Sequence, residues 1–279
     1  MGSEVMGKRE GGRRARGTSP ATKPLVSVIT AVLNGGSSIE RSMASVIAQT
    51  FNSFEYIVID GGSRDGTVDI LRRYEDSIEY WVSEPDRGIY DALNKGVAVA
   101  RGEWLYFLGA DDAFVDSRVL EKVFARRRDT LFIYGDVLFG DSGAIYGGAF
   151  SRRMLTKRNI CQQGIFYSSD LFRLLGPFDK KYPLLADWLY NMRVFSLKES
   201  RPDHLDMVIA EYSLSGASSC KLDLSFYGDR LQLIRKYLGT SCYLYALACR
   251  VQDQVAANWR KYIAIPAARL FRRAKGAGR

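Results

Sequence analysis

The stretch GEWLYFLGADD, residues 102–112, decides how the chain folds. Its run of aromatic and aliphatic residues, Trp104 to Leu108, has the length and composition of a buried strand. Gly109 ends this strand, and two carboxylates, Asp111 and Asp112, follow at once. Ligands of open α/β sheets bind just past the carboxyl ends of the strands. The pair is therefore typical of a divalent-cation site for a phosphate-bearing ligand, or of a turn and helix cap that binds nothing.

The chain before this stretch alternates short strands with short helices. Strands are predicted at residues 25–34 (LVSVITAVLN), 54–59 (FEYIVI) and 78–83, and helices at residues 39–49, 67–74 and 90–100. This alternation predicts an α/β fold with a doubly wound, mostly parallel sheet.

Each of these four strands ends in a loop of small or charged residues. The loops are residues 34–36 (NGG), 60–67 (DGGSRDGT), 84–88 (EPDRG) and 109–112 (GADD). In a parallel sheet they lie at one edge and are expected to converge. Asp60 can accept a hydrogen bond from a nucleoside, Arg87 can neutralise a phosphate, and Asp112 can hold a metal. The second loop taken alone is also a good helix-entry turn.

The second half of the chain has a different pattern. It predicts helices at residues 117–127, 171–176 and 187–198, strands at 131–135 and 144–150, then helices at 226–238 and 243–273 with a break at Pro266. The two strands are expected to pair differently from those of the first half. Residues 1–23 are rich in Gly, Arg and Ser and are expected to be disordered.

The net charge of +9 lies in the two ends of the chain. The first 24 residues carry six Lys and Arg against two Glu, and residues 250–279 carry eight against one Asp. The remainder is nearly neutral, which argues against a basic nucleic-acid groove built into the fold. Basic ends fit contact with an anionic surface such as a membrane leaflet, or they are solvated and bind nothing.

Other features exclude several protein classes. No apolar run approaches the roughly 20 residues that span a bilayer, and no secretory signal follows Met1, so a cytoplasmic protein is expected. The cysteines lack C-x-x-C spacing and are expected to be reduced, packed thiols. With His204 as the one histidine, a histidine-rich zinc site is not expected, and a surface role in a polar loop is favoured for this residue.

Three motifs in fixed order carry a family resemblance. Residues 27–34 (SVITAVLN), 57–67 (IVIDGGSRDGT) and 83–112 (SEPDRGIYDALNKGVAVARGEWLYFLGADD) resemble glycosyltransferase family 2, of the kind that builds bacterial cell-surface glycans. The resemblance covers about residues 25–200. It implies a GT-A fold with helices on both faces of the sheet. It also implies inverting transfer of a sugar from a nucleotide sugar, with Mn²⁺ or Mg²⁺ as cofactor.

The resemblance assigns roles by position. It places five residues near the nucleotide: Thr30, Asp60, Asp86, Arg87 and Asp111. Residues 110–112 stand where the family has its DXD motif, and Ala110 replaces the first aspartate. This departure shifts the metal to Asp112.

The acceptor-side pattern of the family resembles residues 160–164, 176–179 and 186–188. There the aspartate that matches Asp187 is the general base, which removes the proton of the acceptor hydroxyl. A simple helix N-cap is the alternative for Asp187. Relatives often have histidine where Gln162 stands. Trp188 and Tyr190 could stack on a sugar, but their helical spacing favours the core.

The resemblance also suggests partners. A UDP-sugar is favoured as donor and a glycan or lipid-linked glycan as acceptor. The Q-x-x-R-W motif of processive synthases is absent, so transfer of a single sugar is expected. Residues 258–275 have the composition of an interfacial membrane helix, although a helix packed on the protein or on a partner is equally compatible. No nucleic-acid partner is expected.

These assignments predict three regions: a disordered basic tail at 1–23, a GT-A catalytic domain at 24–220, and a helical basic extension at 221–279. The catalytic domain divides into a nucleotide-binding half, 24–110, and an acceptor half, 111–220. Two other functions stay open. A nucleotidyltransferase would need a basic glycine-rich loop after the first strand, and residues 34–38 carry no charge. A catalytically silent nucleotide- or sugar-binding module would bind without transfer.

Overall fold

The computed structural model describes residues 7–125, 129–140, 142–213 and 222–259. The strands are β1 (Arg9–Gly11), β2 (Val26–Val32), β3 (Phe54–Asp60), β4 (Tyr80–Ser83), β5 (Trp104–Phe107), β6 (Ala113–Phe114), β7 (Phe132–Phe139), β8 (Ala144–Tyr146), β9 (Ile165–Ser168) and β10 (Asp203–Tyr212). The helices are α1 (Ile39–Ile47), α2 (Thr67–Arg73), α3 (Ile89–Val99), α4 (Val119–Phe124), α5 (Arg152–Leu155), α6 (Ser169–Leu175), α7 (Ala186–Ser196), α8 (Leu224–Leu233) and α9 (Thr240–Trp259). A 3₁₀ turn, η1 (Gln162–Gly164), precedes β9, and a π-helical segment, η3 (Ile234–Leu238), continues α8.

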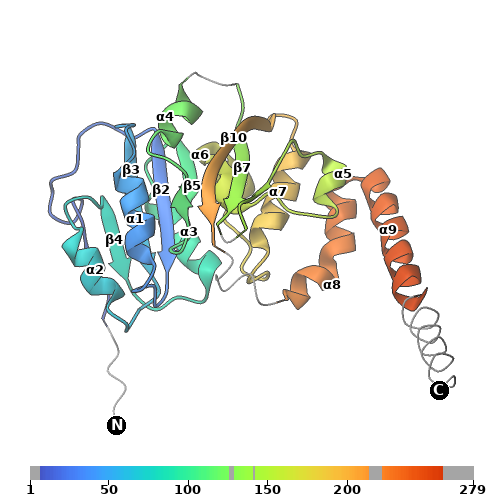
Figure 1. Cartoon of the computed structure of the whole chain (residues 1–279), viewed down its shortest axis with the longest axis horizontal. Coiled ribbons are helices and arrows are strands. Elements are labelled where there is room, and N and C mark those ends of the chain that lie inside the picture. Colours follow the sequence, from blue (N-terminus) through green and yellow to red (C-terminus); the bar gives the residue numbers. More distant parts are fainter. Residues whose placement is uncertain (1–6, 126–128, 141, 214–221, 260–279) are drawn as a thin grey trace, which may run out of the picture.

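One sheet runs through the molecule in the order β1-β4-β3-β2-β5-β9-β7-β10-β6, and β8 pairs with β7 (Figure 1). The four strands β4, β3, β2 and β5 are all parallel, so the predicted parallel half is confirmed. Beyond β5 the pairing is mixed: β9 is antiparallel to β5 and β7, and β10 is parallel to β7. The different pairing predicted for the second half is therefore also confirmed.

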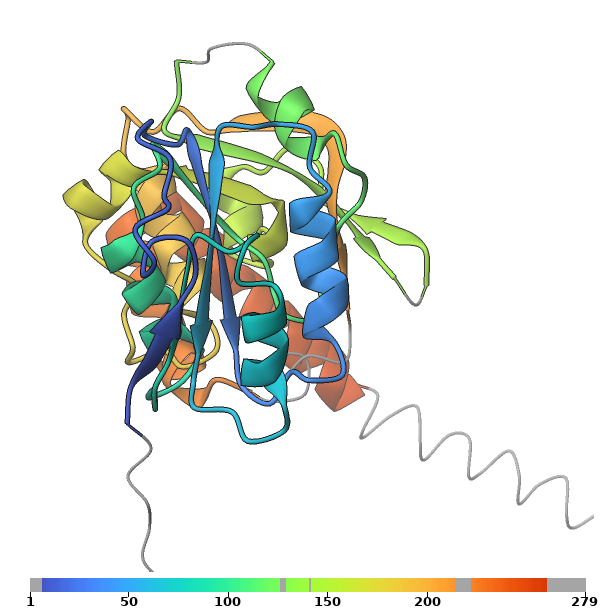
Figure 2. The same cartoon turned by 90° about the vertical axis from the view of Figure 1, so that its left-hand side faces the viewer.

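Helices cover both faces of the sheet, as predicted. Figure 2 shows α1 and α2 on one side of the strands and α3 on the other. In β5, Leu105 and Phe107 face the core beneath α3 and α7, whereas Tyr106 faces the core beneath α1 and α4. A strand that is buried on both faces needs apolar side chains at successive positions rather than at alternate ones. This requirement explains the continuous apolar run that identified β5 in the sequence.

Three strands of the second half, β6, β9 and β10, were not predicted, and β6 is only two residues long. β10 carries partly exposed polar residues along its length, and this makes its sequence resemble a loop. His204, predicted to lie in a loop, is instead in β10, where its Nε2 atom lies 2.9 Å from Asp136 Oδ1. β9 directly follows η1, and only four residues separate the turn from α6.

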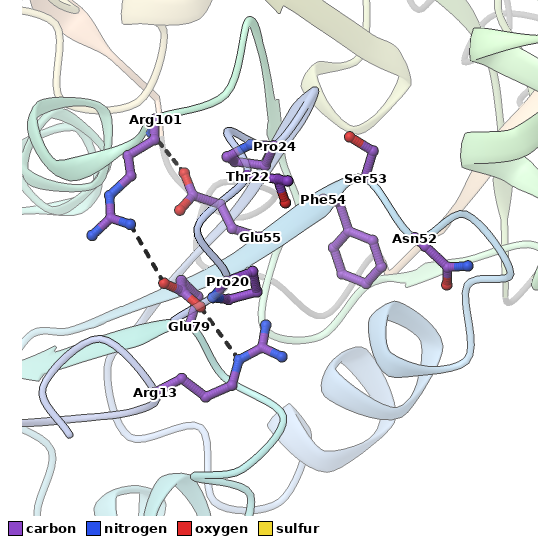
Figure 3. Close-up of a pocket in the computed structure, with 10 residues that line it drawn as sticks. All are labelled: Arg13, Pro20, Thr22, Pro24, Asn52, Ser53, Phe54, Glu55, Glu79 and Arg101. Atoms are coloured by element: carbon purple, nitrogen blue, oxygen red, sulfur yellow. Dashed lines mark hydrogen bonds and ion pairs between the residues drawn. The ribbon is translucent and has the colours of Figure 1, made fainter. Parts of the chain in front are cut away.

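The prediction of disorder is wrong for residues 7–23. β1 pairs antiparallel with β4 at the edge of the sheet, and the amides of Arg13 and Arg14 then donate to the carbonyls of Ile78 and Glu79, just before β4 begins. Arg14 Nη2 lies 2.7 Å from Glu55 Oε2, and Arg13 Nε lies 3.3 Å from Glu79 Oε2. Both glutamates are buried and line a pocket with Arg13 and other residues (Figure 3). The arginines that suggested a solvated tail therefore pair with buried carboxylates.

The C-terminal helices belong to the core beneath α3 and α7. Phe226 of α8, Ile234 and Leu238 of η3 and Cys242 of α9 are buried there. Figure 1 shows α8 and α9 at the end of the molecule opposite β1. Most of the predicted boundary at 216–223, the break at Pro266 and most of the basic segment at 258–275 lie outside the described residues. Within the part of the chain that the structure describes, no helix is both long and apolar enough to cross a membrane.

Candidate active site

The four predicted loops meet at the carboxyl edge of the parallel strands. The Asn34 amide donates to Ser63 Oγ at 2.7 Å, and the Gly36 amide donates to Asp65 Oδ2 at 2.8 Å. These bonds tie the loop after β2 to the loop after β3. Arg41 at the start of α1 donates to the carbonyl of Asp111 at 2.7 Å and so ties the loop after β5 to α1.

The loop after β3 is held by Asp60. This residue is fully buried, and its Oδ2 atom accepts from the amides of Gly62 and Ser63 and from Ser83 Oγ at 2.6 Å. A carboxylate with this many donors shapes the backbone around it. Asp60 thus lies at the predicted edge, where it orders the loop, and its contact with a nucleotide stays a prediction.

Asp86 and Arg87 lie in the loop between β4 and α3. The Asp86 carboxylate accepts from the Gly88 amide at 2.8 Å and packs against Gly61, where a Cβ atom would lie 2.4 Å from its Oδ2 atom. The side chain of Arg87 is exposed. Among the described residues no ion pair holds its guanidinium, so it can bind an anion at this edge.

Thr30 lies inside β2, and the structure does not bring its side chain to the edge. It is fully buried, and its Oγ1 atom accepts a hydrogen bond from the Tyr56 hydroxyl at 3.2 Å. Because residues alternate between the two faces of a strand, Thr30 shares the face that packs beneath α1. It therefore supports the core under the loop after β2.

Asp112 is a buried carboxylate with two neutral donors. Its Oδ2 atom accepts from Gln163 Nε2 at 2.6 Å, and its Oδ1 atom accepts from the Ser213 amide at 2.8 Å. The pKa of Asp112 is raised to about 7, because burial disfavours the charged form and the charge of Asp111 adds to this effect. Gly109 makes room for this carboxylate, since a Cβ atom there would lie 2.3 Å from Asp112 Oδ2.

The carboxylates of Asp111 and Asp112 fit a hard divalent cation that has few protein ligands. Among the described residues no three His, Cys, Asp or Glu side chains form a metal cluster. Mg²⁺ is often held by only one or two carboxylates, with substrate phosphates and water completing the shell. Asp112, with the partly exposed Asp111 beside it, offers that arrangement. A cation would also offset the charge repulsion that contributes to the high pKa of Asp112.

Asp187 is the second buried carboxylate, and it lies in the first turn of α7. Its Oδ1 atom accepts from the Tyr90 hydroxyl at 2.6 Å, and its Oδ2 atom accepts from Asn159 Nδ2 at 2.6 Å. Burial raises the pKa of Asp187 to about 6, although the hydrogen bonds from Tyr90 and Asn159 act in the opposite direction. Leu185 occupies the N-cap position, so Asp187 is not the N-cap residue.

The two carboxylates share a neighbourhood. Burial raises the pKa of the Cys161 thiol, and the charges of Asp112 and Asp187 both add to that rise. The thiol therefore lies within electrostatic reach of both groups. In the described residues, neither carboxylate has a lysine or arginine within ion-pair distance, so both are stabilised by neutral donors.

The sequence drew attention to Gln162, but its neighbour Gln163 makes the hydrogen bond to Asp112. Gln163 donates to Asp112 and accepts from Cys161 Sγ at 3.1 Å. The Nε2 atom of Gln162 is buried without a hydrogen-bond partner. Asn159 and Ser213 were also missed, because an isolated asparagine and a backbone amide carry no sequence signal. Tyr90 lies within the third family motif, residues 83–112, so the family resemblance could have pointed to it.

The two aromatic residues that follow Asp187 belong to the core. Trp188 is buried, and its Nε1 atom donates to the Leu155 carbonyl at 2.8 Å. Tyr190 is buried and stacks on Phe172 with ring centroids 4.8 Å apart. Neither ring is available to a sugar in this structure.

Comparison with solved structures supports the fold. The chain resembles TarS residues 1–349 of S. aureus, crystallised with UDP, with a TM-score of 0.60 and 18% identity; the match covers 76% of this chain and 64% of that one. It also resembles the mannosyltransferase PcManGT of Pyrobaculum calidifontis, in complex with GDP-Man and Mn²⁺, with a TM-score of 0.58 and 16% identity over 88% of this chain and 83% of that one. The chain thus spans less than two thirds of the TarS fragment. At these identities the likeness concerns the GT-A fold alone.

Comparison of sequences identifies the family. A PGL/p-HBAD biosynthesis glycosyltransferase of Mycobacterium tuberculosis is 37% identical over 211 residues, which are 73% of this chain and 82% of the relative. An uncharacterized glycosyltransferase of the same species is 34% identical over 215 residues, 74% of this chain and 81% of that protein. The model of the family Glycosyl transferase family 2 matches residues 27–167. The chain therefore belongs to glycosyltransferase family 2 and is a glycosyltransferase.

Proposed function

We propose that this enzyme transfers a single sugar from a nucleotide-sugar donor to a glycan or lipid-linked glycan acceptor, with inversion at the anomeric carbon. The observation that carries the proposal is the state of Asp187. Its carboxylate is buried, accepts only neutral hydrogen bonds and has a pKa of about 6. A general base works best when its pKa lies near the working pH.

In the proposed reaction, Asp187 takes the proton of the acceptor hydroxyl while that oxygen attacks the anomeric carbon of the donor. The bond from this carbon to the diphosphate oxygen breaks as the new glycosidic bond forms. The proton ends on Asp187 and the electron pair on the departing diphosphate. Arg87, exposed at the same edge of the sheet, is a candidate partner for that developing charge.

Asp112 is the residue that we assign to a divalent cation, with Asp111 beside it. Mn²⁺ or Mg²⁺ held there would neutralise phosphate charge on the leaving nucleotide. The fit rests on a buried carboxylate whose pKa is raised to about 7 without a cationic side chain in contact. PcManGT in complex with GDP-Man and Mn²⁺ has the same fold and supports the assignment by analogy.

The donor is proposed to bind across the loops that follow β2, β3, β4 and β5. Asp60 orders the second of these loops, and Asp86 packs against it. TarS in complex with UDP and with UDP-GlcNAc supports a UDP-sugar, whereas PcManGT in complex with GDP-Man supports a GDP-sugar. The M. tuberculosis relative is named for PGL/p-HBAD biosynthesis, which is compatible with a lipid-linked acceptor.

A thermal-shift screen tests this proposal. UDP, GDP and their sugar conjugates are added to the full chain with Mn²⁺ or with EDTA. The expected result is a rise in Tm that needs both one nucleotide and Mn²⁺, because a ligand that binds only the native state stabilises it. Asp112→Asn should lose the part of the shift that depends on Mn²⁺ and keep the fold. An equal shift in EDTA for the wild type would contradict the metal assignment. A shift with the donor but no transfer to any glycan would favour the silent binding module.

A further inference from the structure

A line of hydrogen bonds reaches Asp187 from β9 and from the segment before η1, and it passes through Asn191 of α7 itself. The Tyr167 hydroxyl in β9 donates to Asn191 Oδ1 at 3.0 Å, and Asn191 Nδ2 donates to Asn159 Oδ1 at 2.9 Å. Asn159 Nδ2 then donates to Asp187 Oδ2 at 2.6 Å. All donors in this line point the same way, toward the carboxylate. Each bond therefore polarises the next in the sense that favours a negative charge at its end.

The line also fixes which end of the Asn159 amide faces the carboxylate. If the Asn159 amide were flipped, its NH₂ group would face the Asn191 NH₂ group and its oxygen would face the Asp187 oxygen. Both contacts would be repulsive, so the hydrogen-bond network selects the orientation given above. Asn191 is fully buried and cannot exchange its partners for water. Asn159 is therefore held as a permanent donor to Asp187.

The second donor to Asp187 is less firmly committed. The Tyr90 hydroxyl lies 2.6 Å from Asp187 Oδ1 and 3.1 Å from the Leu184 carbonyl, and it has one proton for the two acceptors. It can turn to the Leu184 carbonyl when Asp187 becomes protonated. Asn159 has no such alternative, because its oxygen is occupied by Asn191.

We infer that Asn159 is a positioning residue, which orients the Asp187 carboxylate and keeps it ionised through the line that begins at Tyr167. This inference rests on the proposed role of Asp187 as base. It assigns a role to a residue whose side chain hydrogen-bonds to Asp187 and to Asn191. The line passes through the core, so it fixes the carboxylate relative to the sheet itself.

The other titratable groups around Asp187 do not change charge in the pH range over which Asp187 titrates. They come from α3, β8, the segment before η1, and β9, and burial raises the pKa of each of them above its usual value: Tyr90, Tyr146, Cys161 and Tyr167. Asp112 is the exception, because it titrates near pH 7 and shares Cys161 as a neighbour. Variants that leave Asp112 intact can therefore be compared with one another directly.

The test is a carboxyl ¹³C NMR titration of the full chain, labelled at the aspartate side chains, between pH 4 and 9. Asp187→Asn assigns the Asp187 resonance by removing it. Asn159→Leu removes the donor and keeps water out, and the Asp187 midpoint should rise from near 6 by about one pH unit. Tyr90→Phe should raise it by less. A midpoint that does not rise in Asn159→Leu would overturn the inference.

Two further variants separate positioning from general damage to the fold. Asn94→Leu is the matched control: Asn94 exchanges two hydrogen bonds with the Phe178 backbone and does not touch Asp187, so its loss should lower Tm and leave the midpoint in place. Tyr167→Phe removes only a hydroxyl at the far end of the line and should raise the midpoint by about 0.3 pH units. If Asn159→Leu does not fold, an unchanged midpoint in Tyr167→Phe overturns the inference.

The same variants are then assayed with the donor that the thermal-shift screen identifies. The acid limb of kcat should move to higher pH in Asn159→Leu by the amount that the NMR midpoint moves, while KM for the donor stays unchanged. A pH-independent loss of kcat would mean a merely structural role. Wild-type turnover by Asp187→Asn would refute the proposed base instead, and the NMR midpoints would still report whether Asn159 holds the carboxylate.

Discussion

Buried carboxylates occur at both edges of the parallel strands, but they are stabilised in opposite ways. At the amino edge, Glu55 and Glu79 face Arg101 and arginines of residues 7–23, which we call the N-terminal arm (Figure 3). At the carboxyl edge, Asp112 and Asp187 accept hydrogen bonds from amides and a hydroxyl only, and burial raises their pKa values to about 7 and about 6. An internal ion pair satisfies a charge within the protein. A carboxylate with neutral donors retains its affinity for a proton or an external cation.

The largest effect is expected from Asp187→Asn. General-base catalysis contributes about 10² to 10⁴ in rate, so kcat should fall by that factor while nucleotide binding is kept. The fold should persist, because the new amide can donate to Tyr90, whose hydroxyl then donates to the Leu184 carbonyl 3.1 Å away. Steady-state transfer kinetics and nucleotide titration provide the measurement. An unchanged kcat would show that Asp187 is not the general base.

Glu55→Gln tests whether the ion pairs at the amino edge stabilise the fold. Glu55 accepts from Arg14 Nη2, from Ser27 Oγ and from the Arg101 amide at 2.6–2.7 Å. Removing one partner of a buried ion pair weakens the compensation of the other charge. Because Arg14 is partly exposed and its Nε atom also lies 3.8 Å from Glu79 Oε1, the expected loss is about 2 to 3 kcal/mol. Chemical denaturation measures it.

The exposed pair Arg16–Asp76 provides the matched control. Its side chains are 41% and 91% exposed, so Asp76→Asn should cost less than about 0.5 kcal/mol. Both variants should leave the acid limb of kcat near pH 6. A shift of that limb in Glu55→Gln would mean that the two edges are coupled.

Among the variants of the two buried carboxylate groups, the smallest expected effect is on the pH dependence of stability. The pKa of Asp187 is raised on folding, so the native state binds more protons between pH 4 and 6 and the contribution of Asp187 to stability falls as pH rises through that window. Relative to wild type, Asp187→Asn should therefore gain about 2 kcal/mol between pH 4 and pH 7. Urea unfolding of both proteins across this range measures the difference. If Asp187→Asn instead lost stability relative to wild type as the pH rises, Asp187 would be stabilised as an anion in the folded protein.

The parallel half could be predicted from sequence because its signals are local. A strand that is buried on both faces shows a continuous apolar run, and a strand-end loop shows glycines and acids. The N-terminal arm could not be predicted, since Gly11 and Gly12 resemble linker residues. In the structure a Cβ atom on Gly11 would lie 2.6 Å from the Trp81 ring, and Gly12 has a φ of +92° beside the Ile78 carbonyl. Their small size is a packing requirement that only the partner strand reveals.

The same distinction holds within the site. The sequence by itself determined that Asp111 and Asp112 follow a buried strand and that Asp187 begins a helix, because strand ends and helix starts are local events. Only the tertiary structure decided that Thr30 faces the core and that Asn159 and Gln163 hold the two carboxylates. Asn159 is 28 residues from Asp187, and Gln163 is 51 from Asp112. Contacts over such separations depend on how helices and strands pack, and the residue types at the two ends do not encode that packing.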